Sequence, residues 1–286
     1  MAARLIFALF FLLVVGWLLH QRGASWGSAA VLVAVVTIKP AFVTMLALIV
    51  AISGTAFFVR AAALGLAAGL LSIAVMRWPI HARFLDFMAQ LSGQSTAWAF
   101  GSGVTVPLES IHLAWDSAPT IGGTPGLSAA VVVVRLTVCA LFAWLLVLSR
   151  RQAWDGSARR RVEWAIGVMF CLMVAPVVWE HYLAILFLPL ALLVASEDRL
   201  PPAARRFALA AVALGCVQNL VVVDLLWDRM IGAPWPLHVG VALVKAGPLL
   251  LTGLLLVRYR RAVFACFAFE PSPGPATESA TGSANC

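Results

Sequence analysis

Charged residues are scarce in this chain of 286 residues. They make up 11% of the sequence, against about 25% in a typical soluble domain. Residues of the apolar set AVILMFWYC account for 63%, and the mean hydropathy is +0.98. This composition excludes an ordinary water-soluble globular fold, whose surface needs more charge than the chain carries.

The signatures of several soluble enzyme classes are also absent. The sequence contains no GxxxxGK[ST], no GxGxxG after a strand and no HExxH. ATPases, dinucleotide-dependent enzymes and zinc proteases therefore lose support. The five cysteines are scattered without a CxxC pair, a pattern typical of small core residues rather than of a metal site or disulfide framework. We expect no metal and no cofactor.

Instead of these motifs, the sequence contains long apolar runs. Several of them approach the roughly 20 residues that cross a bilayer as a helix. None shows the alternation of an outer-membrane barrel strand, which leaves helices as the spanning element. We therefore predict an all-α, polytopic bundle of eight or nine transmembrane helices. The runs lie at 4–19, 26–38, 41–57, 61–77, 127–148, 163–178, 182–195, 207–226 and 239–257.

The runs divide the chain into two parts of different character. We expect residues 1–261 to form one polytopic transmembrane domain with a long external loop at 79–126. The remaining residues, 262–286, are rich in Pro, Ser, Gly and Ala. This composition predicts a disordered C-terminal tail, because such a segment cannot bury enough apolar surface to fold.

The arginines indicate how the chain is oriented. The formal net charge is +8, and the arginines cluster at the ends of apolar runs. Five of them lie in 149–161, a density typical of cytoplasmic loops. We expect a cytoplasmic C-terminus, membrane lipids as neighbours and no nucleic-acid partner. The N-terminal side stays open: nine crossings place it outside, whereas a single span over 26–57, broken at Lys39–Pro40, places it inside.

The turn between two late apolar runs holds the first candidate site. Trp179, Glu180, His181 and Tyr182 stand there in sequence. Ionisable residues at the membrane edge carry a solvation cost, so a functional role is the default hypothesis. His181 can bind a phosphate when protonated or accept a proton when neutral. The alternative is an interfacial turn whose polar residues face water.

Lys39 forms a second polar position, in an otherwise uncharged run. It can pair with the phosphate of an anionic lipid, or extend to the nearer interface if Pro40 ends a helix. The external loop offers Asp86, Glu109 and Asp116 as candidate general bases, and nothing in the sequence selects among them. Within that loop, 80–91 has the spacing of a short helix lying in the membrane interface.

The order of three motifs resembles a known family. TIKPAFVTMLAL begins at residue 37, RFLDFMAQLSGQS at residue 83 and APVVWEHYLAILFLPLALL at residue 175. Together they resemble glycosyltransferase family 87, membrane enzymes of the GT-C type that use polyprenyl-phosphate sugars and include bacterial α-mannosyltransferases. The resemblance extends to about residue 257.

This resemblance implies a function and a set of site residues. A mannose-like hexose is expected to pass from a polyprenyl-phosphate-linked donor to a glycolipid or glycan acceptor, at the external face of a bacterial inner membrane. His181 and Glu180 are the implied catalytic residues. Lys39, Trp179 and Tyr182 are the implied substrate contacts.

The same resemblance leaves one role without a residue. Family members carry an acidic residue in a first external loop, and this chain is expected to begin after that portion. The acidic role is therefore not carried over to any position here, and a truncated or inactive relative is one expectation. A transporter or flippase with broken spans in both halves and a non-catalytic membrane scaffold are the alternatives.

Overall fold

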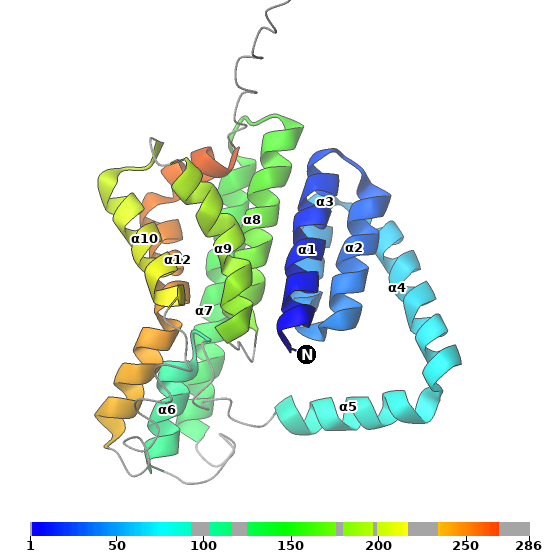
Figure 1. Cartoon of the computed structure of the whole chain (residues 1–286), viewed down its shortest axis with the longest axis horizontal. Helices are drawn as coiled ribbons and strands as arrows, with labels where there is room; N and C mark the ends of the chain where they lie inside the picture. The colour runs from blue at the N-terminus through cyan, green and yellow to red at the C-terminus, as the bar shows by residue number, and fades with distance from the viewer. Residues whose placement is uncertain are drawn as a thin grey trace, which may run out of the picture.

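The computed structural model of this chain is all-helical. It describes residues 2–92, 103–115, 125–175, 180–196, 199–216 and 234–268. Every regular element in these ranges is a helix, and they contain no strand, which confirms the all-α prediction. Figure 1 shows most of the helices standing side by side in a bundle, with α4 and α5 forming an arm that leaves it.

In the first half of the chain, α2 packs on α1 and on α4, whereas α3 packs mainly on α8. The bounds of the helices in this half are Ala2–Gln21 (α1), Ser25–Ile38 (α2), Pro40–Phe42 (the 3-10 turn η1), Val43–Ser53 (α3), Thr55–Met76 (α4) and Trp78–Ser92 (α5).

The helices of the second half pack around the last of them, because α12 contacts α6, α8, α9 and α10. Their bounds are Val106–Trp115 (α6), Pro125–Arg150 (α7), Gly156–Val174 (α8), Glu180–Ala195 (α9), Pro202–Cys216 (α10) and Trp235–Ala268 (α12).

Helix α8 joins the two halves. It contacts α1 and α3 on one side and α7, α9 and α12 on the other. Its side chains from Arg161 to Met169 are all buried, and Trp164 is among the largest fully buried side chains of the described residues. The apolar core is therefore continuous from the first half of the chain to the second.

Arginines around the α7–α8 connection bind the C-terminal ends of three other helices. The Arg160 guanidinium donates to the Gln21 carbonyl oxygen from Nε and Nη2, at 3.1 and 2.8 Å. Arg150 Nη2 donates to the Ile52 oxygen at 2.8 Å, and Arg161 donates to the main-chain oxygen that ends α12. These contacts define what we call the basic end, at the top of Figure 1.

Such contacts satisfy a physical requirement of the helix. The last four carbonyls of an α-helix have no partner within it and carry the negative end of its dipole. Cationic donors at this position are therefore favourable, and more so where little water competes. The arginines expected to face the cytoplasm thus also hold helix ends together.

The start of α8 differs from the expected one. The apolar run was predicted to begin at 163, but the helix begins at Gly156 because Asp155 caps it. Asp155 Oδ1 accepts from the Ala158 amide at 2.6 Å and from the Ser157 hydroxyl at 2.7 Å. The hydrogen bond from the Ala158 amide, and to a smaller extent that from the Ser157 hydroxyl, holds the pKa of Asp155 below its usual value. The two added turns carry Arg160 and Arg161, two of the three arginines of the basic end.

The Lys39–Pro40 break lies at a turn between two antiparallel helices. Arg60, near the start of α4, donates to the hydroxyl of Ser25, the first residue of α2. Since α4 directly follows α3, the start of α2 and the end of α3 lie at the same end of the bundle. The alternative of one span over 26–57, broken at Lys39–Pro40, does not fit this arrangement, because α3 runs back alongside α2 toward the end where α2 begins. Helix α1 begins at the end opposite the basic end (Figure 1).

A glycine that the sequence reading passed over separates α3 from α4. Gly54 has φ +85°, a conformation that side-chain-bearing residues rarely adopt. The break was predicted between the runs 41–57 and 61–77, and lies instead at this residue. Boundaries read from hydropathy alone miss such positions because glycine interrupts the backbone geometry without interrupting the apolar run.

Three helices are long and apolar enough to cross a membrane by length and composition. The described residues contain Thr55–Met76, Ala129–Arg150 and Pro236–Ala268 of this kind, and four shorter apolar helices of 10 to 17 residues. At 1.5 Å per residue, α3 with its 11 residues rises about 17 Å, against about 30 Å of hydrocarbon. Eight or nine crossings stay a prediction.

The expected boundary at residue 261 does not mark the end of the helix. Helix α12 continues to Ala268, and Val263, Phe264 and Phe267 are buried. The ring of Phe264 lies 6.0 Å from that of Trp154, edge to face. The start of the predicted tail, 262–268, is thus helical because it buries apolar side chains, and 269–286 lies outside the described residues.

Arg160→Ala removes both bonds to the Gln21 oxygen and leaves that helix end without its cationic donor. Hydrogen bonds made by charged groups contribute about 1.5–3 kcal/mol, so we expect the unfolding free energy to fall by that order. The measurement is unfolding in mixed micelles with increasing denaturing detergent. Arg159→Ala, at an exposed neighbouring position, is the matched control. Equal effects of the two variants would contradict the assignment.

Gly16→Ala tests the close approach of α1 to α8. A Cβ at Gly16 would lie 2.8 Å from a ring carbon of Trp164, and that ring is fully buried. We expect a loss of about 1–3 kcal/mol from overpacking. Gly69→Ala on α4 is the control, because nothing lies within 4 Å of its added Cβ. That variant should be neutral or stabilise by about 0.5–1 kcal/mol.

Candidate functional site

Two carboxylates are buried among the described residues, Glu163 at 5% exposure and Glu109 at 1%, and Glu109 is the more enclosed. Glu109 lies in the first turn of α6, and only 1% of the residue is exposed. The hydroxyl of Thr105 donates to Glu109 Oε1 at 2.7 Å, from a residue that is itself buried. Because a buried carboxylate without partners is strongly disfavoured, the groups around it decide whether the acid can exist there.

Helix α7 supplies a cation to this carboxylate. Arg135 Nη2 lies 3.9 Å from Glu109 Oε1, and 34% of the Arg135 side chain is exposed. This distance is too long for a direct hydrogen bond but short enough for an ion pair. The pair therefore joins a fully enclosed acid to a base that reaches the surface of the protein.

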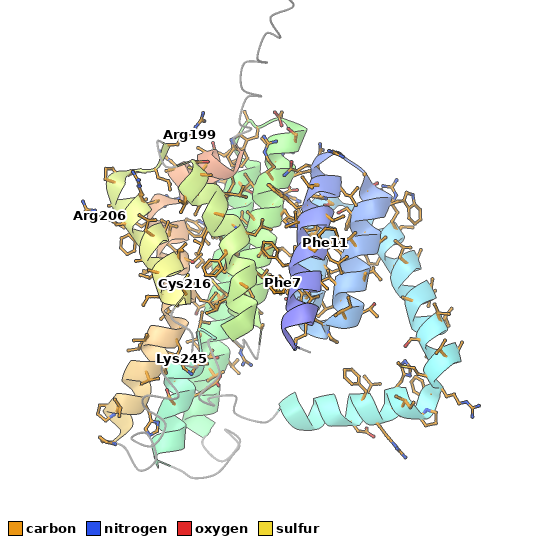
Figure 2. All side chains as sticks on the ribbon, viewed as in Figure 1. Phe7, Phe11, Arg199, Arg206, Cys216 and Lys245 are labelled. Atoms are coloured by element: carbon orange, nitrogen blue, oxygen red, sulfur yellow. The ribbon has the colours of Figure 1, made fainter. Side chains whose placement is uncertain are left out.

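Helix α12 carries a further buried cation. Lys245 is 8% exposed, and α12 packs along α6. Figure 2 places Lys245 on the part of α12 that runs beside α6. We call Thr105, Glu109 and Arg135 the Glu109 cluster, since measured distances join these three side chains.

The cation of the cluster lies within a candidate membrane span. Arg135 falls inside Ala129–Arg150, and Lys245 falls inside another, Pro236–Ala268. Ionisable residues within membrane spans are costly and mark sites of function more often than sites of packing. Chemically, the carboxylate can accept a proton or bind a hydroxyl, and the cations can stabilise an anion.

The structure distinguishes two of the three acids that the sequence left equal. Asp86 is exposed on α5 and Glu109 is enclosed, while Asp116 lies outside the described residues. Sequence reasoning missed Arg135 altogether, although a single arginine inside the apolar run 127–148 was the available signal.

The residues named from the resemblance are placed only by their backbone. Lys39 caps the end of α2, while Glu180, His181 and Tyr182 open α9. Trp179 lies outside the described residues, as do the side chains of those three. Helix α9 ends near the end of α12, where Cys266 Sγ donates to the Ser196 oxygen at 3.8 Å.

These backbone positions share one end of the bundle. Since α2 starts at the basic end, Lys39 lies at the opposite end. Since α9 finishes beside the C-terminal end of α12, which Arg161 binds, its first turn also lies at the opposite end. That these side chains meet one another, or the Glu109 cluster, stays a prediction.

A second buried polar group lies at the basic end. His20 is 5% exposed, and its ring lies 5.6 Å from that of Trp164 and 6.0 Å from that of Phe57. In the described part of the chain, His20 Nε2 has no hydrogen-bond partner. Because aromatic rings pack against this imidazole, we treat His20 as a packing residue.

The ranges covered by the structure hold no group of three His, Cys, Asp or Glu side chains able to hold a metal. A comparison with family models, curated proteins and solved structures found no match to the chain. The function of the chain is therefore inferred from the chemistry of its own residues.

A double-mutant cycle tests the ion pair. Arg135→Gln should destabilise the protein more than Glu109→Gln, because it leaves a buried carboxylate without a cation whereas a glutamine still accepts from Thr105. The double variant should lose less than the sum, with a coupling of about 0.5–3 kcal/mol. The measurement is detergent-induced unfolding, with exposed Arg206→Gln as control. Additive losses would show that the two side chains do not interact.

Proposed function

We propose that this chain is an integral membrane glycosyltransferase of the GT-C type, similar to family 87. It transfers a mannose-like hexose from a polyprenyl-phosphate donor to a glycolipid or glycan acceptor at the external face of a bacterial inner membrane. The observation that carries the proposal is the Glu109 cluster, a buried carboxylate with one cation 3.9 Å away among apolar helices. The motif resemblance supplies the reaction class.

The proposed orientation follows from the basic end. Its arginines face the cytoplasm, so α12 ends there and the C-terminus is cytoplasmic. Lys39, the first turn of α9 and the arm helix α5 then face outward. In this arrangement the short apolar helices cross together with the three long ones, as eight or nine spans with locally thinned bilayer around the shortest.

The proposed chemistry assigns the acidic role that the resemblance left without a residue. An acceptor hydroxyl attacks the anomeric carbon of the sugar, the new carbon–oxygen bond forms, and the bond to the phosphate oxygen breaks. Glu109 accepts the hydroxyl proton, and Arg135 and Lys245 stabilise the departing phosphate. A lipid-linked donor needs no nucleotide-binding fold, which agrees with an all-helical chain.

The residues around the first turn of α9 complete the proposed site. His181 acts as a phosphate or proton partner, and Glu180 holds its imidazole or contacts the acceptor. Lys39 contacts the donor phosphate, while Trp179 and Tyr182 contact the substrates. Tryptophan and tyrosine suit this position because their rings pack on sugar and lipid at the membrane interface.

Hexose transfer by the purified protein in liposomes tests the proposal. A radiolabelled polyprenyl-phosphate hexose and a lipid-extract acceptor are supplied, and labelled product is counted. Glu109→Gln and His181→Ala should each lower the rate by about 10²–10⁴-fold, the range of general acid–base contributions. Arg206→Ala, exposed on α10, should leave the rate unchanged. Transfer that survives Glu109→Gln would remove Glu109 from the mechanism.

A transporter or flippase is the second candidate. Proline stands inside α9 at Pro189 and inside α12 at Pro248, and η1 follows Lys39 in the first half. Interrupted helices in both halves are a feature of transporters. Movement of the labelled lipid across the liposome membrane without transfer of its sugar would favour this candidate over the enzyme, and absence of both would favour a non-catalytic scaffold.

A further inference from the structure

Helix α4 leaves the bundle after its first two turns. Phe57 and Ala61 are buried, while the apolar side chains beyond them are exposed, among them Leu66, Leu70 and Leu71. The helix has 22 residues and so rises about 33 Å, close to the thickness of a bilayer's hydrocarbon core. Its far end therefore lies at the level of a membrane interface when the helix crosses.

The chain turns sharply at that far end. Arg77 has φ +63° and ψ +151°, a conformation that costs a non-glycine residue on the order of 1–3 kcal/mol. Helix α5 begins at the next residue and runs across the direction of the bundle helices (Figure 1). A strained corner is retained only where surrounding interactions hold it.

A histidine supplies those interactions and sets the rotation of α5 about its own axis. His81 Nε2 lies 3.0 Å from the hydroxyl of Ser72 on α4, and His81 Nδ1 lies 3.2 Å from the Arg77 carbonyl oxygen. A carbonyl only accepts, so Nδ1 donates and Nε2 is left to accept from Ser72 when the ring is neutral. These two hydrogen bonds turn the face of α5 that carries His81 toward α4.

The two faces of α5 differ in chemistry. Trp78, Phe84 and Leu85 stand three or four residues from His81 and so share its face. All three side chains are exposed. Arg83 and Asp86, three residues apart, occupy the opposite face and are also exposed. We call these the apolar face and the charged face of α5.

We propose that α5 lies in the boundary between phospholipid headgroups and acyl chains, with its apolar face in the acyl chains and its charged face in water. The proposal rests on the membrane insertion of α4 and not on glycosyl transfer. A bilayer is the occupant because the apolar face of α5 is turned toward α4. The exposed apolar side chains of α4 require acyl chains around them, and the apolar face of α5 requires the same. Tryptophan at the corner suits this depth.

Spin-label accessibility in liposomes of phosphatidylcholine and phosphatidylglycerol tests this placement. The native cysteines are replaced by alanine, and one cysteine is then introduced on the apolar face (Phe84→Cys) or the charged face (Asp86→Cys). Each label is exposed to oxygen, which partitions into acyl chains, and to a water-soluble nickel chelate. Leu70→Cys on α4 serves as the reference for a lipid-facing position.

The expected result is a reversal between two positions on one short helix. The label at 84 should be relaxed more by oxygen than by the nickel chelate, as at 70, and the label at 86 should show the opposite order. Equal accessibility at 84 and 86, with 70 in lipid, would overturn the proposal for α5 alone. Water exposure at 70 would overturn the insertion of α4 and the membrane proposal with it.

A second measurement guards against a misfolded variant. Trp78→Phe and Trp78→Ser in the native-cysteine background leave the bundle core untouched, since Trp78 is exposed at the start of α5. Since Trp78 is one of 11 tryptophans, quenching by lipids brominated at the upper acyl positions should fall by the part that Trp78 contributes, and by the same amount in both variants. Unchanged quenching would place Trp78 away from the acyl chains and contradict the proposal.

Discussion

The arrangement of this bundle depends on a requirement at helix ends: carbonyl groups that lack a partner inside the helix must find a donor elsewhere. Arg150, Arg160 and Arg161 meet it for α3, α1 and α12. These bonds join residues 98 to 139 positions apart along the chain, so one short basic stretch fixes which helices stand together and in which direction. The cap at Asp155 extends α8 far enough to carry two of these arginines.

Polar partners are also scarce at the end of the bundle opposite the basic end, where Glu109 lies. In an apolar chain an ionised carboxylate is tolerated only beside a cation and a hydrogen-bond donor. Glu109 has both, from Arg135 on α7 and from Thr105 just before α6. Such a group stabilises the fold little compared with an apolar residue of similar volume, so its burial is better explained by chemistry. This contrast separates the Glu109 cluster from His20, whose ring packs against those of Trp164 and Phe57.

The arm formed by α4 and α5 follows a different principle, because almost nothing in the protein covers it. Its shape is held locally, by one strained residue at Arg77 and one imidazole that bonds across the corner. Such local bonds direct the surface of α5 toward the surroundings of the protein rather than toward its core. The bundle thus encloses the buried ionisable groups, whereas the arm exposes an amphipathic helix.

The sequence alone determined the helical class, the apolar runs and the clustering of arginine, because composition and hydropathy are local quantities. It also named Glu109, Lys39 and the turn before α9 as polar exceptions. Only the tertiary structure decided that Glu109 is enclosed while Asp86 is exposed, that Arg135 is its partner, and that Lys39–Pro40 turns the chain back. Those outcomes depend on which helices pack together, and residues 26 positions apart, such as Glu109 and Arg135, have no local pattern that joins them.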